Sequence, residues 1–151
     1  MRGLDAAGCA ILDAQGQVLL VHQTYRDKLW EVPGGIVAPG ESAWDAAVRE
    51  CREEIGVTPL APHLSGIYHR AWNDSYVFIF RALAFEGSLR PDDDEIDAAR
   101  YFRLEDIPWP VTSFALERLR DALEFRGEVS LRTEQHEDRR LLGRRSGEDG
   151  P

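Results

Sequence analysis

The sequence predicts one domain of the α/β class, in which short strands combine with two amphipathic helices. Three observations lead to this fold class. The chain has 151 residues, enough for a single domain with a buried core. Its apolar runs have the length of strands, as in VLLV at 18–21, and none is long enough to cross a membrane. Two longer segments, 42–56 and 112–125, carry apolar residues at helical spacing instead.

The composition is typical of a globular protein, with 43% hydrophobic and 30% charged residues. The formal net charge is −9, so we expect no nucleic-acid partner bound through a basic surface. An anionic substrate would have to be met by metal ions or by a local cluster of arginine or lysine. Since we recognise no leader sequence, we expect a cytoplasmic protein with no membrane partner. Cys9 and Cys51 are expected to be buried free thiols.

The first strands are predicted from apolar runs and turn residues. Residues 6–12 and 17–22 are separated by the turn sequence Asp-Ala-Gln-Gly, and we expect them to pair as an antiparallel hairpin. A polar loop containing Arg26 and Lys28 leads to a short strand at 29–32. The Pro-Gly-Gly sequence that follows is expected to end this strand.

The first helix is predicted to begin at Ser42, whose hydroxyl can cap the helix with Asp45 three residues further on. Gly56 is a typical stop signal. On a helical wheel the apolar residues gather on one side, which we expect to enter the core. These residues are Trp44, Ala47, Val48, Cys51 and Ile55.

The second half of the chain predicts strands at 63–70 and 75–85, the second rich in Tyr, Val, Phe and Ile. A polar, acidic loop occupies 86–95. A short strand at 98–104 and a second amphipathic helix at 112–125 complete the predicted elements.

We predict one catalytic-type domain over residues 1–127 and a C-terminal extension over 128–151. Within the extension, residues 128–133 could form an edge strand or no regular structure, and residues 143–151 have the composition of a disordered end. A homodimer formed through an edge strand or through the extension is an open alternative.

Three carboxylates, those of Glu50, Glu53 and Glu54, lie on one face of the first predicted helix. At 3.6 residues per turn they fall at about 0°, 300° and 40° on the helical wheel. Like charges this close destabilise a helix unless a cation lies between them, and a divalent metal is the obvious candidate. The alternative is a solvated acidic face on a surface helix.

The segment from Gly35 to Val57 resembles the Nudix box, G-x(5)-E-x(7)-R-E-U-x-E-E-x-G-U, in which U is a bulky aliphatic residue. The matching positions lie in register over the whole segment, which is far more specific than a lone glycine-rich loop. One residue, Cys51, departs from the pattern, at a position that packs in the core. The positions are Gly35, Glu41, Arg49, Glu50, Cys51, Glu53, Glu54, Gly56 and Val57.

This resemblance implies a Nudix-like α/β/α sandwich, with a mixed sheet between helices, that hydrolyses nucleoside diphosphates linked to another group with Mg²⁺ or Mn²⁺. By the same resemblance Glu50 and Glu54 are the main metal ligands, and Glu53 is a ligand or the base that activates water. A backbone carbonyl near Gly34 completes the metal site. A cluster of hard oxygen ligands suits Mg²⁺, which can neutralise a diphosphate and orient water.

Other residues of the site follow from the same resemblance. Glu41 pairs with Arg49 to fix the loop against the helix, so both support the catalytic groups. Many members bring a further glutamate from the acidic loop, and Glu95 is the expected position, with a solvated loop as the alternative. Glu53 and Glu95 therefore remain rival candidates for the catalytic base.

Substrate-binding candidates lie outside the box. Arg26 and Lys28 could contact phosphate, and Trp72 and Trp109 could stack on a base. Trp30, like Trp44, is expected in the core. The substrate class stays open among nucleoside triphosphates, oxidised nucleotides, nucleotide sugars, ADP-ribose, dinucleoside polyphosphates and dinucleotide coenzymes. The alternative function is a catalytically silent Nudix-like module that binds a nucleotide and regulates a partner.

Overall fold

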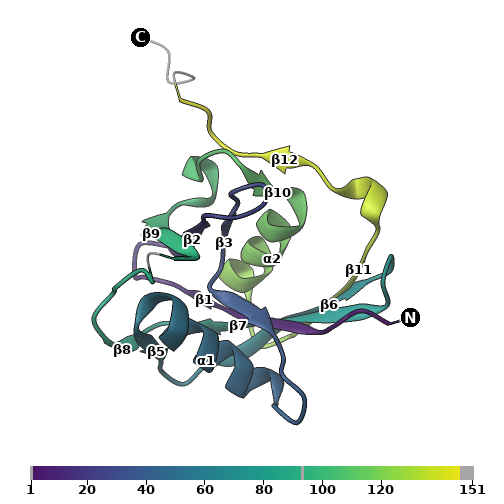
Figure 1. Ribbon diagram of the computed structural model, residues 1–151, viewed down its shortest axis with the longest axis horizontal. Helices are drawn as coiled ribbons and strands as arrows, with labels where there is room; N and C mark the ends of the chain where they lie inside the picture. The colour runs from purple at the N-terminus through teal and green to yellow at the C-terminus, as the bar shows by residue number, and fades with distance from the viewer. Residues whose placement is uncertain (1, 93, 147–151) are drawn as a thin grey trace.

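The computed structural model describes residues 2–92 and 94–146 (Figure 1). The last part of the predicted disordered end, residues 147–151, lies outside this description. The helices are α1 (Ala43–Ile55) and α2 (Ser113–Glu124), and short 3-10 turns cover Leu104–Asp106 and His136–Asp138. In chain order the strands are β1 (Ala6–Ile11), β2 (Val18–Gln23), β3 (Trp30–Glu31), β4 (Gly34–Ile36), β5 (Val57–Pro59), β6 (His63–Arg70), β7 (Ser75–Ala82), β8 (Phe85–Gly87), β9 (Ile96–Phe102), β10 (Val111–Thr112), β11 (Ser130–Glu134) and β12 (Leu141–Leu142).

The central sheet has the strand order β11-β6-β7-β1-β4. It is mixed, because β1 runs parallel to β7 and β11 parallel to β6, whereas the other two pairings are antiparallel. A second sheet has the order β3-β2-β9. In Figure 1 α1 lies below the central sheet and α2 above it. The predicted α/β fold class and its α/β/α layers are therefore confirmed.

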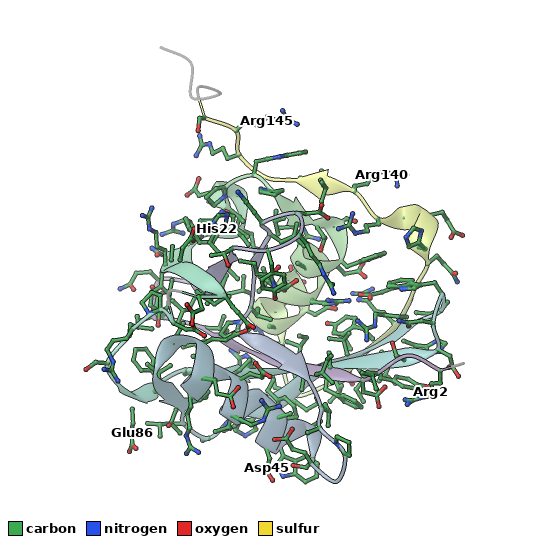
Figure 2. All side chains as sticks on the ribbon, in the orientation of Figure 1. Arg2, His22, Asp45, Glu86, Arg140 and Arg145 are labelled. Atoms are coloured by element: carbon green, nitrogen blue, oxygen red, sulfur yellow. The ribbon has the colours of Figure 1, made fainter. Side chains whose placement is uncertain are left out.

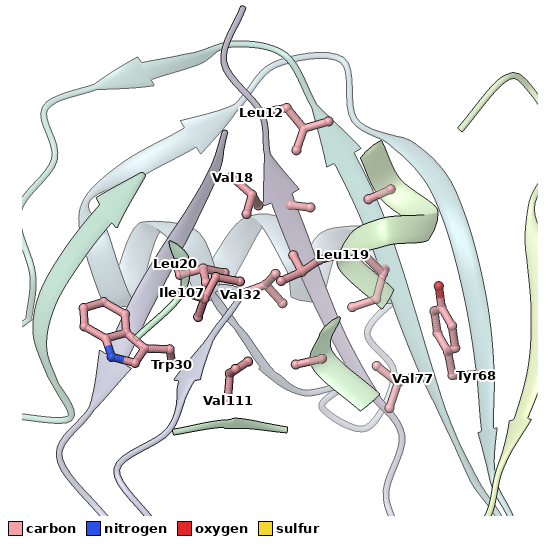
Figure 3. Close-up of a cluster of buried hydrophobic side chains, with 14 residues drawn as sticks. Leu12, Val18, Leu20, Trp30, Val32, Tyr68, Val77, Ile107, Val111 and Leu119 are labelled. Atoms are coloured by element: carbon pink, nitrogen blue, oxygen red, sulfur yellow. The ribbon is translucent and has the colours of Figure 1, made fainter. Parts of the chain in front are cut away.

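Two apolar clusters fill the spaces between these layers. On the α1 side Cys51 and Ile55 pack with Cys9 and Phe80 of the sheet, and both cysteines are buried free thiols as expected. On the α2 side the cluster combines helix, sheet and the second sheet, and it includes the predicted core residue Trp30 (Figure 3). Neighbouring residues of β1 point to opposite clusters, as the alternation of side chains along a strand requires.

The predicted hairpin of the first two strands is wrong. β1 and β2 meet at one bridge, between Leu12 and Val18, and then separate into different sheets. Most positions of both strands are buried. A strand that is apolar on both faces suits the interior of a sheet, so each has other neighbours with which to bury its surface. The turn sequence fixes the bridge, but it does not decide the pairing beyond it.

The strand before the Pro-Gly-Gly sequence ends as expected, because β3 stops at Glu31, and a separate strand of the central sheet, β4, begins at Gly34. Gly34 lies opposite Gly8 of β1. A Cβ atom on Gly34 would stand 2.6 Å from the carbonyl oxygen of Ala7. The absence of a side chain therefore allows two backbones to approach closely, so Gly34 permits the pairing of β4 with β1.

Helix α1 begins and ends as predicted. The Ser42 hydroxyl accepts a hydrogen bond of 3.0 Å from the Asp45 N–H, and Gly56 ends the helix at φ 74°. The expectation that Trp44 is a core residue is wrong, because it is 62% exposed. Trp44 shares a side of the wheel with Ala47 but lies in the first turn, next to the exposed loop at 38–40. The wheel gives the direction of a side chain and not its depth.

The C-terminal segment 128–146 packs against the rest of the molecule. Of the two alternatives for 128–133, the structure shows an edge strand, β11. Beyond it the chain crosses above α2 to pair β12 with β10, and Figure 2 shows Arg140 and Arg145 along this path. Within the described residues no helix is long and apolar enough to cross a membrane.

A buried carboxylate fastens β11 to α2. Asp121 is 7% exposed. It accepts a hydrogen bond of 2.7 Å from the Tyr68 hydroxyl and two of 2.8 Å from the Arg132 guanidinium. These donors lower the pKa of Asp121 against the effect of burial, which raises it.

We expect Asp121→Asn to lower the free energy of unfolding by about 2 kcal/mol, because the buried Tyr68 hydroxyl loses a charged acceptor and the exposed Arg132 loses its two-bond carboxylate partner. Urea denaturation at pH 7 measures this loss. Glu117→Gln is the matched control, because Glu117 lies one turn earlier on α2 with a side chain that is 44% exposed. Its expected effect is below about 0.5 kcal/mol, and equal losses in the two variants would contradict the assignment.

Candidate active site

Glu54 is the most deeply buried acid of the Nudix-like segment. It is 7% exposed, and its Oε2 accepts a hydrogen bond of 3.0 Å from the Gly34 N–H. Burial raises the pKa of Glu54 to about 8, and the nearby charge of Glu50 adds to this increase. The fold thus places a carboxyl group where its ionised form is unfavourable unless a cation is present.

Glu50 lies against the backbone of β4. A Cβ atom on Gly35 would stand 2.6 Å from the Glu50 Oε1. The glycine therefore opens the space that this carboxylate fills. The Glu50 side chain is 15% exposed and accepts a hydrogen bond of 2.9 Å from Arg49. Burial raises the pKa of Glu50 more than the Arg49 charge lowers it.

Arg49 connects the loop before α1 to the acidic face of the helix. Its Nε donates to Glu41 at 2.8 Å, and its Nη2 donates to the Ile36 carbonyl at 3.0 Å. Its Nη1 donates to Glu50 and, at 3.1 Å, to Glu53. The pKa of Arg49 is raised chiefly by Glu41, so the guanidinium stays charged. The structure brings together Glu41 and Arg49 in the arrangement expected of supporting residues.

The two remaining acidic candidates are more open to solvent. The Glu53 side chain is 59% exposed and pairs with Arg49. Glu95 lies just before β9, and its charge raises the pKa values of Glu50 and Glu54. Glu95 therefore faces the same region as the two buried glutamates, although it belongs to a distant part of the sequence.

The donors at this site fit a hard divalent cation. Over residues 2–92 and 94–146 no three His, Cys, Asp or Glu side chains converge as a ready-made metal cage. Glu50 and Glu54 nevertheless form a buried like-charge pair beside the backbone of Gly34. Mg²⁺ commonly uses one or two carboxylates and completes its coordination with water and substrate phosphate. The residues present therefore suit Mg²⁺ or Mn²⁺.

The raised pKa of Glu54 predicts how stability depends on pH. The unfolded chain releases this proton near the ordinary value of 4.5, whereas the folded protein keeps it up to about pH 8. Without divalent metal, stability should therefore fall between about pH 4.5 and 8, by on the order of 3 to 5 kcal/mol. Added Mg²⁺ should raise the melting temperature more at pH 8 than at pH 5.5, because it favours the ionised carboxylate.

Melting curves of the wild-type protein and of Glu54→Gln, with and without Mg²⁺, test this expectation. The difference in melting temperature between the two proteins gives the effect of Glu54 alone, because both carry the same repulsion among the other acidic residues. Parallel pH profiles for the two proteins would show that Glu54 does not carry the effect.

A cavity of about 480 Å³ adjoins the glutamates. Its lining includes Gly34, Gly35 and Ile36 of β4, and β4 connects it to the glutamates, because the Gly34 N–H binds Glu54 and Gly35 faces Glu50. The glutamates themselves are not among the lining residues. Of the predicted substrate-binding residues, the cavity contains Arg26 and Trp72. The Trp72 ring is 42% exposed and stacks on Phe114 with ring centres 5.5 Å apart.

The other two substrate-binding candidates, Lys28 and Trp109, are not among the residues that line this cavity. Lys28 follows Arg26 in the same loop, with φ 53°. The Arg145 guanidinium covers the Trp109 ring at 3.9 Å from its centre. Trp109 is thus engaged by the C-terminal segment.

Three arginines of the cavity escaped prediction: Arg70, Arg118 and Arg139. They come from β6, α2 and the C-terminal segment. The net charge predicted that an anionic substrate needs metal ions or a local cationic cluster, but it could not say which residues form one. Their spacing in the sequence does not predict that they line one cavity, because only the topology of the fold brings them together.

Comparisons with known proteins agree with this geometry. A family model of the NUDIX domain matches residues 3–122. A putative 8-oxo-dGTP diphosphatase of Bacillus subtilis is 46% identical over 61 residues, which cover 40% of this chain and 40% of the relative. The NAD-capped RNA hydrolase NudC of Vibrio cholerae is 32% identical over 95 residues, 62% of this chain and 35% of the relative. The chain thus spans well under half the length of these two relatives.

A solved structure shows the same architecture. The crystal structure of a MutT NUDIX hydrolase from Burkholderia pseudomallei superposes with a TM-score of 0.72 at 26% identity. The superposition covers 80% of this chain and 98% of the other. The glutamate helix and its adjoining loop therefore lie in a fold shared along most of both chains.

Proposed function

This chain belongs to the Nudix family, and from that premise we propose that it is a metal-dependent pyrophosphohydrolase. Its reaction is the cleavage of the P–O–P bridge of a nucleoside diphosphate linked to another group. The observation that carries this proposal is the buried carboxylate of Glu54, held by the Gly34 N–H beside Glu50 at the edge of the cavity. Burial raises the pKa of Glu54 to about 8, which does not fit a solvated acidic face on a surface helix. A bound cation would offset the unfavourable free energy of the ionised carboxylate.

Each residue has a proposed role. Glu50, Glu54 and Glu53, with a backbone carbonyl near Gly34, hold Mg²⁺ or Mn²⁺. When bound, the metal supplies charge neutralisation for the diphosphate and a more acidic water. Glu41 and Arg49 orient the loop and Glu50.

The proton acceptor from water is Glu53 or Glu95. Glu53 is accessible but paired with Arg49, and Glu95 is the rival that faces the same glutamates. The pH–rate profiles of Glu53→Gln and Glu95→Gln distinguish the two candidates. Replacement of the residue that accepts the proton should abolish the fall in rate at acidic pH.

The cavity receives the nucleoside part of the substrate. Trp72 offers a ring for stacking and Arg26 a cation for phosphate. One relative is named for 8-oxo-dGTP and another for NAD-capped RNA, so an oxidised nucleotide and a capped RNA both belong among the substrates to test. A cytoplasmic location stays a prediction, which cell fractionation tests. A homodimer stays a prediction as well, which measurement of the molecular mass in solution tests.

The decisive experiment uses chromatography to measure the release of the two products of P–O–P cleavage, with Mg²⁺ and with Mn²⁺, over a panel of substrates. It covers nucleoside triphosphates, 8-oxo-dGTP, nucleotide sugars, ADP-ribose, dinucleoside polyphosphates, dinucleotide coenzymes and NAD-capped RNA. We expect release from at least one class by the wild-type protein and none by Glu54→Gln. No release from any class would overturn the hydrolase proposal.

A catalytically silent nucleotide-binding module is the second candidate. One observation favours it: Glu50 and Glu53 are both engaged by Arg49, with no ready-made three-ligand cage in the described part of the chain. Binding of ADP-ribose or a nucleotide by calorimetry, without turnover on any metal, would support this candidate instead.

A further inference from the structure

The strand β11 forms one edge of the central sheet, and its outer side is unpaired in the part of the chain that the structure describes. Two hollows of about 460 and 500 Å³ lie along it, each lined by residues of β11 and of α2. An open edge offers a row of hydrogen-bond donors and acceptors to another strand. This edge is therefore a candidate interaction surface.

One hydrogen bond shows which backbone groups of β11 face outward. The Ala71 N–H donates to the Glu134 carbonyl at 3.0 Å, so Glu134 turns its backbone groups toward β6. Because these groups alternate in direction along a strand, those of Arg132 also face β6, whereas those of Leu131 and Thr133 face outward. In the described ranges no segment other than β6 forms a backbone hydrogen bond with Leu131 or Thr133. The donors and acceptors of these two residues are therefore open to a further strand.

The charged side chains of β11 do not block this edge. Arg132 and Glu134 form ion pairs with α2, so their charges are neutralised within the chain. Val129 and Leu131, which alternate with them, are 37% and 74% exposed. Natural sheet edges are commonly protected by exposed charges, by proline or by a covering segment. Here an exposed apolar pair stands in place of such protection, which favours burial against a partner.

The sequence of the edge is complementary to itself when two copies run in opposite directions. An antiparallel pair of segments 128–132, centred on Ser130, sets Glu128 against Arg132 of a second copy. The same pairing sets Val129 against Leu131, and each of these pairs occurs twice. Opposite charges and apolar side chains both stabilise antiparallel strands when they lie directly across from one another. This self-complementarity identifies a second copy of the chain as the partner.

Both charged residues are available for such a pair. The Arg132 side chain is 44% exposed, and its hydrogen bonds to Asp121 use Nε and Nη2, which leaves Nη1 for another carboxylate. Glu128 is exposed, and it forms no ion pair within residues 2–92 and 94–146. An exposed anion and a guanidinium with a spare donor group can therefore meet without breaking a contact inside either copy.

The charges also select the register of the pair. Centring it one residue later, on Leu131, would set Glu128 against Glu134 of the second copy. Centring it on Arg132 would set two guanidinium groups against each other. Like charges directly opposite one another destabilise paired strands. The register centred on Ser130 avoids both conflicts.

We propose that two copies of this chain associate through β11, antiparallel and centred on Ser130, so that their central sheets become one continuous sheet. A two-fold arrangement of this kind uses the same surface on both copies. Leu131 of each copy exchanges two backbone hydrogen bonds with Val129 of the other, because both residues turn these groups outward. The surface is separate from the proposed reaction, so its test does not depend on turnover.

Sedimentation equilibrium measures the association. We expect the wild-type protein to form a dimer of twice the 17.1 kDa chain mass. Glu128→Arg should raise the dissociation constant about 10-fold or more, because two cations then face each other in both charge pairs. A wild-type protein that stays monomeric up to about 1 mM would refute the association and leave the edge to a strand of another protein.

Glu86→Arg is the matched control for this measurement. Glu86 is exposed on β8, which pairs with β5 on the side of the molecule away from β11 (Figure 1). The same change of charge there should leave the dissociation constant within about 2-fold. Equal losses in the two variants would show that net charge, and not this edge, controls the association.

A mixture of two variants tests the charge pairs directly. Arg132→Glu alone sets two anions against each other, as Glu128→Arg sets two cations, so each variant should associate weakly. When the two are mixed, every charge of one copy faces the opposite charge of the other. We expect heterodimers that are about 10-fold or more tighter than either variant alone. No gain on mixing would contradict the pairing of Glu128 with Arg132.

A disulfide tests the register without changing any charge, so it does not depend on the folding of Arg132→Glu. The two Ser130 residues would form a pair without hydrogen bonds, with Cα atoms about 4.5 Å apart, which a disulfide can span. Ser130→Cys should therefore give a covalent dimer under mild oxidation, whereas two cysteines at Thr133→Cys would lie about 20 Å apart. The native Cys9 and Cys51 are fully buried and do not compete. Covalent dimers of neither variant, or mainly of Thr133→Cys, would overturn the proposed register.

Discussion

Replacing Glu54 by glutamine should lower kcat by about 1000-fold, because it removes one of the two buried carboxylates proposed to hold the metal. The fold should survive, since a glutamine oxygen can still accept the Gly34 N–H. Without metal, the variant should melt at a higher temperature than the wild-type protein at pH 8, because a costly buried charge is gone. Steady-state kinetics and thermal melting measure both effects.

Asp45→Asn is the matched control for this prediction. Asp45 lies on the same helix, but its side chain is exposed in the first turn. The same chemical change there should leave kcat within about 2-fold and should not raise the melting temperature. A Glu54→Gln variant that retains more than about a tenth of wild-type kcat would remove the metal-binding role assigned to this residue.

Replacing Gly35 by alanine should lower kcat by about 100-fold with little loss of stability. The new Cβ atom would stand 2.6 Å from the Glu50 Oε1, so the carboxylate must leave its position. The displaced group is the end of a flexible side chain, and Gly35 is not among the glycines with positive φ, so the backbone can accept alanine. The substitution should therefore displace the Glu50 carboxylate, a proposed metal ligand, and leave the fold intact.

Gly16→Ala is the matched control, because it should lower stability without changing kcat. Gly16 has φ 74°, and a Cβ atom added there would meet no neighbouring group within 4 Å. Alanine there should cost about 1 kcal/mol of stability through backbone strain and leave kcat unchanged. Kinetics and urea denaturation on both variants test the contrast. Full activity of Gly35→Ala would show that the position of Glu50 over this glycine is unimportant.

Features determined by neighbouring residues could be predicted from the sequence. Ser42 and Gly56 specify where α1 begins and ends through local hydrogen bonds and backbone geometry. The helical period brings Glu50, Glu53 and Glu54 to one face without reference to the rest of the chain. The loop residue Glu41 pairs with Arg49 over eight positions, which the family resemblance implied.

Features determined by distant segments could not be predicted. β1 finds its main partner in β7, about seventy positions away, because both are apolar strands with many acceptable neighbours. Apart from Arg26, the arginines of the cavity wall lie on three separate segments, so neither spacing nor composition connects them. Trp44 and Cys51 share one side of a helix, yet one is exposed and the other is fully buried.

The path of the C-terminal segment has a consequence for synthesis of the protein. The NUDIX match ends at residue 122, but Arg139 contributes to the cavity wall and Glu134 neutralises Arg118. While the chain emerges from a ribosome, the glutamate helix can fold early, whereas the cavity stays incomplete until Arg139 has been added. A nascent chain therefore acquires its proposed metal ligands before it acquires a finished binding site. For the same reason, an expression fragment cut at the family boundary would leave β6 as an open sheet edge and Arg118 without its partner.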